Sequence, residues 1–138
     1  MTRIFWDSNV FIYLLQNTEQ HGRRASEMLA RIEERGDDLL ISTFGLGEVL
    51  AGTQIGTKRR QWQLGIESVA RVVSFDRSAV ATFADLRSKN KVRPGDAVQL
   101  AVAAAQGVDL FITADKELAR ISHVPGINFI SDMERAPI

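Results

Sequence analysis

Short apolar runs alternate with stretches of helical spacing along this chain, and this alternation constrains the fold more than any other feature. The runs span residues 4–6, 39–41, 72–75, 110–112 and 127–130. A strand that is apolar at every position is buried on both faces, as in a parallel sheet that helices cover on both sides. Strands that alternate with helices therefore predict an α/β fold with a parallel sheet and helices on both faces.

The expected helices fill the intervals between these strands. Pro94 suits the first position of a helix, and Gly107 is expected to end that helix. We find no internal repeat, low-complexity segment or linker, so we expect a single domain over 1–138, with frayed last residues. Helical spacing predicts helices over 10–15, 18–35, 58–70, 77–89 and 94–106, a helix that carries Glu48, and a short helix after Asp115.

The charge balance limits the classes of partner. Lys plus Arg and Asp plus Glu each number 17, so the formal net charge is zero and a nucleic-acid partner requires a local basic patch. The absence of cysteine excludes disulfides and thiolate metal sites, and it suits a reducing cytosol. The apolar run at 10–15 is too short to cross a bilayer and lacks the basic leader of a signal peptide. We therefore expect a cytoplasmic protein without a membrane partner.

The segment 96–105 is almost wholly apolar, yet it carries a carboxylate, Asp96, in its first turn. A helix that is apolar all round belongs in a protein core, where an ionised carboxylate is costly without compensation. The helix dipole favours an acid at this position by about 0.3–1 kcal/mol. The dipole explains why Asp96 is tolerated, but it does not explain why the rest of the helix is so apolar.

Three aspartates follow predicted strands: Asp7, Asp76 and Asp115. Each could simply cap the next helix, which is a common role for aspartate. Ligands of open parallel sheets, however, bind outside the carboxyl ends of the strands. Ser8 and Asn9 follow Asp7, and Thr113 precedes Asp115 by two residues, so both acids lie among other oxygen-bearing side chains. Asp76 has no comparable setting, and we assign it to capping.

Glu48 is the only charged residue of the segment 44–52, which also contains three glycines. A glutamate at such a position could face solvent, as charged residues usually do. Each glycine weakens the helix by about 1 kcal/mol relative to alanine. Close approach of another backbone would explain the glycines, although packing alone could also do so.

Together these acids resemble a known pattern. The chain is similar over essentially its whole length to the PIN-domain ribonucleases, and among them to the VapC-type toxins of bacterial toxin–antitoxin pairs. The resemblance implies a three-layer α/β/α domain with a five-stranded parallel sheet. The glycine-rich setting of Glu48 departs from the family pattern, in which bulkier residues are frequent. The similarity lies in residues 6–10, Ser42 with Glu48, residues 96–101 and residues 112–115.

The resemblance also implies a metal site formed by Asp7, Glu48, Asp96 and Asp115. Oxygen-only ligands favour hard ions that keep several waters, Mg²⁺ or Mn²⁺. Ser8, Asn9 and Thr113 match family positions that support the metal or its waters. His21 lies on a predicted surface helix and His123 in a loop near Pro125, so we expect neither to be catalytic.

The implied activity is metal-dependent hydrolysis of RNA phosphodiester bonds, which leaves a 5′-phosphate and a 3′-hydroxyl. The implied partners are a second copy of the chain in a homodimer and an antitoxin protein. For the RNA backbone we expect a local basic patch beside Asp96, formed by Arg87, Lys89, Lys91 and Arg93. A second basic run at 58–60 is expected to be a solvated helix start.

Two other functions remain open at this point. One is a nuclease of the same fold that acts in RNA processing or on structured nucleic acid outside a toxin–antitoxin pair. The other is a non-catalytic module that binds nucleic acid or protein, although the presence of all four acids argues against it. A receiver domain or a haloacid dehalogenase-like phosphatase is a remote option, because Lys116 lies at a helix start rather than at a strand end.

Overall fold

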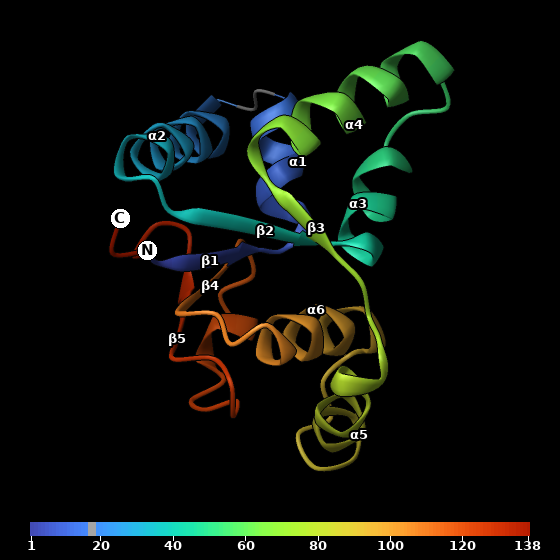
Figure 1. Ribbon diagram of the computed structural model, residues 1–138, viewed down its shortest axis with the longest axis vertical. Helices are drawn as coiled ribbons and strands as arrows, with labels where there is room; N and C mark the ends of the chain where they lie inside the picture. Colours follow the sequence, from blue (N-terminus) through green and yellow to red (C-terminus); the bar gives the residue numbers. More distant parts are fainter. Residues whose placement is uncertain (17–18) are drawn as a thin grey trace.

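Five parallel strands form one sheet in the order β3-β2-β1-β4-β5, as the computed structural model shows for residues 1–16 and 19–138 (Figure 1). The prediction of a five-stranded parallel sheet is therefore confirmed. In the register of the sheet, Phe5 lies between Leu40 and Phe111. The strands are β1 (Arg3–Trp6), β2 (Asp38–Ser42), β3 (Arg71–Val73), β4 (Leu110–Thr113) and β5 (Phe129–Asp132).

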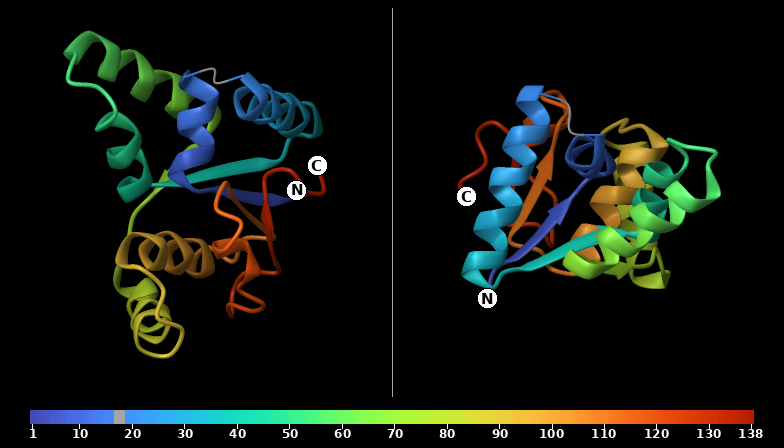
Figure 2. Two further views of the ribbon diagram at one scale, coloured as in Figure 1. Left: turned by 180° about the vertical axis from the view of Figure 1, so that it is seen from behind. Right: turned by 90° about the horizontal axis from the view of Figure 1, so that it is seen from above.

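Helices cover both faces of this sheet, as predicted (Figures 1 and 2). Successive residues of a strand point to opposite faces, so Ile4 and Trp6 pack with one group of helices and Phe5 with the other. The first group is α1 (Ser8–Gln16), α2 (Glu19–Arg35), α3 (Thr43–Leu50) and α4 (Gly56–Val69), and the second is α5 (Val80–Ser88) and α6 (Pro94–Ala105).

The strand order reverses beside β1. The chain adds β2 and β3 on one side of β1 and then β4 and β5 on the other. Such a reversal leaves a crevice outside the carboxyl ends of the two strands that flank it. Those strands are β1, which Asp7 follows directly, and β4, which Asp115 follows after one residue.

Several predicted boundaries are wrong by one or more residues. The third strand ends at Val73, and 3-10 turns at η1 (Arg77–Ala79) and η2 (Leu118–Arg120) replace the start of one predicted helix and the whole of another. The fifth strand begins two residues later than predicted, because Ile127 is buried in a tight turn where it pairs with Val124. The predicted helix start at Thr18 lies outside the described residues.

The prediction of a frayed C-terminus is also wrong. Met133 and Ala136 are buried against the helices of the first group. Arg24 of α2 donates hydrogen bonds to the carbonyl oxygens of both residues, at 2.9 and 3.1 Å. In the described part of the chain, no helix is both long enough and apolar enough to span a membrane.

Candidate functional site

Asp7 is a buried carboxylate at the carboxyl end of β1. Its Oδ2 accepts a hydrogen bond from the Thr113 hydroxyl, and its Oδ1 accepts one from the Asn9 backbone N–H at 3.1 Å. Burial raises the pKa of Asp7 to about 6, although these hydrogen bonds oppose the rise. The hydrogen bonds therefore do not fully offset the cost of burying the ionised carboxylate of Asp7, and a nearby cation would stabilise this form.

Asp96 lies in the first turn of α6, after the predicted Pro94 start. Burial raises the pKa of Asp96; the carboxylates of Asp115 and Glu48 raise it further, and Arg93 opposes them. Asp96 in turn contributes to the raised pKa of Asp7. The four predicted acids therefore lie within electrostatic range of one another at this edge of the sheet.

Asp115 uses its two carboxylate oxygens differently. Its Oδ1 accepts hydrogen bonds from the backbone N–H groups of Glu117 and Leu118, at 2.9 and 3.4 Å, which is a capping role. Its Oδ2 instead lies 3.4 Å from a guanidinium nitrogen of Arg93. Thr113 accepts a hydrogen bond from the Asp115 N–H at 3.0 Å, and its own hydroxyl proton is donated to Asp7. Thr113 thus connects the two aspartates.

Glu48 remains solvent-exposed on α3, but its carboxylate is directed to the start of α1. The Ser8 hydroxyl donates a hydrogen bond to Glu48 Oε1 at 2.8 Å. Ser8 is buried directly after Asp7, so this contact ties the glutamate to the end of β1. Glu48 is therefore exposed, as expected for a solvent-facing glutamate, but its carboxylate is directed to the end of β1 and not to solvent alone.

Asp76, which we assigned to capping, behaves as predicted. Its carboxylate accepts hydrogen bonds from the backbone N–H of Ser78, at 3.0 Å, and from the Ser78 hydroxyl. These bonds lower the pKa of Asp76. The same strand–aspartate–helix pattern thus produces an ordinary cap here and an interacting group of acids at Asp7 and Asp115.

A hollow of about 300 Å³ opens among three of the acids. Asp7, Asn9, Asp96 and Asp115 line it, together with Gly95 and Arg93. Over residues 1–16 and 19–138, no three His, Cys, Asp or Glu side chains gather closely enough to enclose a metal ion. Mg²⁺ commonly keeps several of its waters and takes only one or two carboxylates directly. The oxygen donors and their mutual repulsion therefore fit a hydrated hard cation better than a dehydrated one.

Arg93 supplies positive charge to this hollow. Its guanidinium nitrogens lie 3.6 Å from an Asp96 oxygen and 3.4 Å from an Asp115 oxygen. The Arg93 side chain is nevertheless 78% exposed, so these ion pairs are weak and exchangeable. The positive charge of Arg93 reduces the repulsion between the carboxylates of Asp96 and Asp115.

Of the other predicted RNA contacts, two have partners of their own, and Lys91 lines a neighbouring hollow together with Asp96 and Asp115. Arg87 donates a hydrogen bond to the carbonyl oxygen of Val92 at 3.0 Å, and Lys89 pairs with Asp85 at 3.4 Å. Lys91 has a positive φ of 54° in the connecting loop. RNA binding by these residues stays a prediction, and of the four only Arg93 lines the first hollow.

Gln99 is a site-positioning residue to which sequence reasoning gave no role. It is buried in α6, one turn beyond Asp96, and its Oε1 accepts a hydrogen bond from Ser42 at 2.6 Å. The Ser42 oxygen in turn accepts from the N–H of Gly45 at 2.8 Å, in the first turn of α3. This chain of contacts joins the helix of Asp96 to the helix of Glu48. The signal was present, because Gln99 is the one polar residue within the apolar stretch 97–105.

The Gln99 contact also accounts for one glycine near Glu48. A Cβ at Gly45 would lie 2.9 Å from Gln99 Nε2, whereas a Cβ at Gly47 would meet nothing within 4 Å. We expect Gly45→Ala to lower the free energy of unfolding by about 1–3 kcal/mol through overpacking. The control Gly47→Ala is expected to raise it by up to about 1 kcal/mol, because alanine favours helix. Urea denaturation of both variants checks this, and equal stabilities would contradict the close contact.

Comparisons with known proteins agree with this architecture. Residues 4–124 match the PIN domain family. A search of curated protein sequences found no significant match.

Similar solved structures include toxin–antitoxin complexes at low sequence identity. VapBC2 from Rickettsia felis, bound to a promoter DNA fragment, is 13% identical with a TM-score of 0.71, over 95% of this chain and 98% of that chain. A Klebsiella pneumoniae toxin–antitoxin complex is 22% identical with a TM-score of 0.70, over 90% and 94%. VapBC-1 from nontypeable Haemophilus influenzae is 19% identical with a TM-score of 0.71, over 97% and 100%. At these identities the likeness concerns the fold.

Proposed function

The chain belongs to the PIN domain family, and on that basis we propose that it is a Mg²⁺- or Mn²⁺-dependent endoribonuclease. The observation that carries the proposal is the meeting of Asp7, Asp96 and Asp115 around one hollow, with Glu48 in electrostatic range. Asp7 and Asp115 follow β1 and β4, whereas Glu48 comes from α3 and Asp96 from α6, so separate parts of the chain bring their carboxylates to one place. Like charges brought together in this way require a cation or protonation.

The proposed metal ligands are Asp7, Glu48, Asp96 and Asp115. A bound Mg²⁺ or Mn²⁺ ion supplies Lewis-acid chemistry, because it lowers the pKa of its water and stabilises charge on a phosphate. The chain contributes the placement of the ligands. Thr113 and Asn9 hold the two oxygens of Asp7 in a fixed orientation, and Ser8 holds Glu48.

The protonation state of Asp7 sets a condition on this activity. With a pKa of about 6, Asp7 is largely ionised at neutral pH and increasingly protonated below it. A protonated carboxyl is a poor ligand for a hard cation, so cation binding and proton release are coupled at this residue.

We further assign the chain to the toxin half of a toxin–antitoxin pair, acting as a homodimer with an antitoxin protein as its partner. The assignment rests on the family resemblance of the four acid-bearing segments. It is supported by the similar structures, several of which are toxin–antitoxin complexes from bacteria. Single-stranded RNA is the proposed substrate.

Metal dependence of RNA cleavage tests the proposed activity. We expect the purified chain to cut single-stranded RNA in Mg²⁺ or Mn²⁺ and to leave 5′-phosphate ends. Excess EDTA is expected to abolish cleavage, and added Mn²⁺ to restore it, because an oxygen-only site binds hard cations. A DNA strand of the same sequence serves as the control and should be cut more slowly. Cleavage that persists undiminished in EDTA would contradict the proposal.

A further inference from the structure

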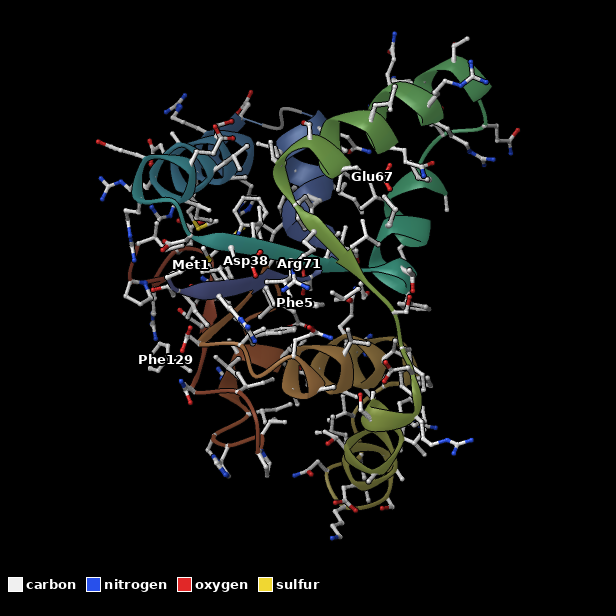
Figure 3. All side chains as sticks on the ribbon, in the orientation of Figure 1. Met1, Phe5, Asp38, Glu67, Arg71 and Phe129 are labelled. Atoms are coloured by element: carbon white, nitrogen blue, oxygen red, sulfur yellow. The ribbon has the colours of Figure 1, made fainter. Side chains whose placement is uncertain are left out.

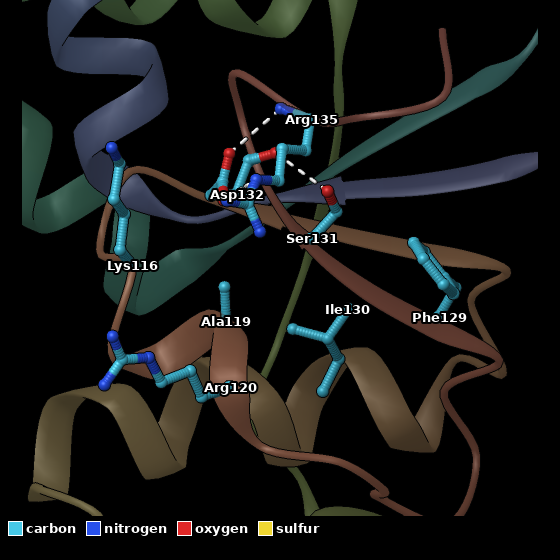
Figure 4. A pocket seen from close by; sticks show the side chains of 8 residues that line it. All are labelled: Lys116, Ala119, Arg120, Phe129, Ile130, Ser131, Asp132 and Arg135. Carbon is cyan, nitrogen blue, oxygen red and sulfur yellow. Dashed lines mark hydrogen bonds and ion pairs between the residues drawn. The ribbon is translucent and has the colours of Figure 1, made fainter.

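A second hollow, of about 280 Å³, lies between η2 and the edge strand β5 (Figure 4). It begins beside the acids, since Lys116 directly follows Asp115 and Asp132 pairs with Thr113 in the sheet. A neighbouring hollow of about 190 Å³ shares Arg120 and Phe129 with it and continues toward His123. The two form one groove, which we call the β5 groove, along the edge of the sheet away from the acids.

The β5 groove concentrates positive charge in a chain whose net charge is zero. Its first hollow is lined by the cations Lys116, Arg120 and Arg135 and by one acid, Asp132. Arg135 lies 3.9 Å from Asp132, whereas Lys116 and Arg120 take part in no ion pair among the described residues. The nearby Glu117 lines a different hollow, together with Lys91 and Arg93. The groove therefore holds two exposed cations without an internal counter-charge.

An exposed aromatic ring lies in the same groove. Phe129, the first residue of β5, is 55% exposed and points outward at the margin of the molecule (Figure 3). Because it packs in neither hydrophobic core, its exposure is not a by-product of core formation. Exposed aromatic side chains beside cations are the arrangement with which proteins bind single-stranded nucleic acid, the ring stacking on a base and the cations on phosphates.

We propose that the β5 groove holds the segment of single-stranded RNA that extends from the acid hollow. Lys116 and Arg120 contact its phosphates, and Phe129 stacks on one of its bases. The proposal rests on the proposed function, because it takes RNA as the substrate. It adds phosphate contacts on the β5 side of the acids to those open to Lys91 and Arg93, which line a hollow with Asp96 and Asp115. Arg87 and Lys89 of the predicted patch have partners within their own loop and helix.

Binding of RNA without cleavage tests the phosphate contacts. Fluorescence anisotropy is measured in EDTA with a labelled single-stranded RNA. The RNA has about 12 nucleotides, which is within the known site sizes of single-strand binding proteins. We expect Lys116→Ala with Arg120→Ala to weaken binding roughly tenfold and to reduce the slope of log K against log salt by about 1.4. The matched control, Arg23→Ala with Arg60→Ala, removes the same charge from exposed positions on α2 and α4 and should change the affinity less than about twofold.

The aromatic contact has its own variants. Phe129→Ala is expected to weaken binding roughly tenfold, and Phe129→Tyr to retain it, because tyrosine keeps the stacking face. Circular dichroism and the melting temperature establish that each variant is folded. Equal affinity of the groove and control variants, or no binding of this RNA by the unchanged chain, would overturn the inference.

Two further outcomes separate this inference from the proposed function and from a protein partner. Groove-dependent binding by a chain that never cleaves RNA in Mg²⁺ or Mn²⁺ would refute the proposed function and leave the groove assignment standing. RNA binding that is unchanged while the groove variants alter the sedimentation of the chain would make the β5 groove an interface between two copies, and would overturn the inference.

Discussion

Asp96→Asn is expected to reduce RNA cleavage by at least about 100-fold while the chain stays folded, because loss of even an indirect metal-site contact costs 10- to 100-fold. Asparagine has nearly the volume of aspartate, so the packing of α6 is kept. The substitution removes the carboxylate that interacts with Asp7, Glu48 and Asp115. Cleavage rates of the purified variant and the unchanged chain, in Mg²⁺ and at equal concentration, measure the effect.

Asp76→Asn is the matched control for this prediction. Asp76 also lies between a strand and a helix, but among the described residues its carboxylate bonds to Ser78 alone, so cleavage should stay within about twofold of the unchanged chain. Expression in bacteria gives a second readout. The unchanged chain and Asp76→Asn should arrest growth, and Asp96→Asn should not. Equal cleavage by the Asp96 and Asp76 variants would remove Asp96 from the site.

The fold was predictable because its strands are buried on both faces. The runs at 4–6, 39–41 and 110–112 are apolar without interruption and lie within the three central strands of the sheet. The edge strands β3 and β5 were predicted with shifted ends. At an edge the hydrophobic signal weakens, and a buried turn residue such as Ile127 resembles a strand residue.

The acids of the candidate site were predictable for a related reason. Parallel strands bring their carboxyl ends to one edge, so Asp7 and Asp115 had to lie near each other once the strands were recognised. The hydrogen bond from Thr113 to Asp7, which joins the ends of β4 and β1, depends on exact register and could not be predicted. The same holds for the Arg93 contacts with Asp96 and Asp115, since a flexible basic loop can direct its charges in many ways.

The β5 groove illustrates what local sequence patterns cannot reveal. Lys116, Arg120 and Arg135 are spread over the last quarter of the chain and form no basic run. They meet only because η2 packs beside β5, whose boundaries were themselves mispredicted. The basic run before Asp96 was conspicuous in the sequence, yet Arg87 and Lys89, two of its four charges, have partners within their own loop and helix.

Asp7→Asn is expected to stabilise the metal-free chain at pH 7.5 by about 1–2 kcal/mol. The pKa of Asp7 is about 6 in the fold and near 3.8 in the unfolded chain. Between these values the folded chain retains a proton that the unfolded chain has lost, so the contribution of Asp7 to stability falls as pH rises from about 4 to 6. A difference of two pKa units corresponds to about 3 kcal/mol of stability that the substitution recovers. Asparagine accepts one hydrogen bond fewer than aspartate, and this loss reduces the gain by about 1 kcal/mol.

The stabilisation should vanish in acid and reverse in metal. At pH 4 the folded chain already carries a protonated Asp7, so Asp7→Asn is expected to be neutral or slightly destabilising there. Mg²⁺ is expected to raise the stability of the unchanged chain at pH 7.5, because a ligand that binds only the folded state stabilises it, and to leave the variant nearly unaffected. Urea denaturation in EDTA at both pH values, and in Mg²⁺ at pH 7.5, measures all three effects. An equal loss of stability at pH 4 and pH 7.5 would mean that Asp7 is a structural hydrogen-bonding residue and not a carboxylate held ready for a cation.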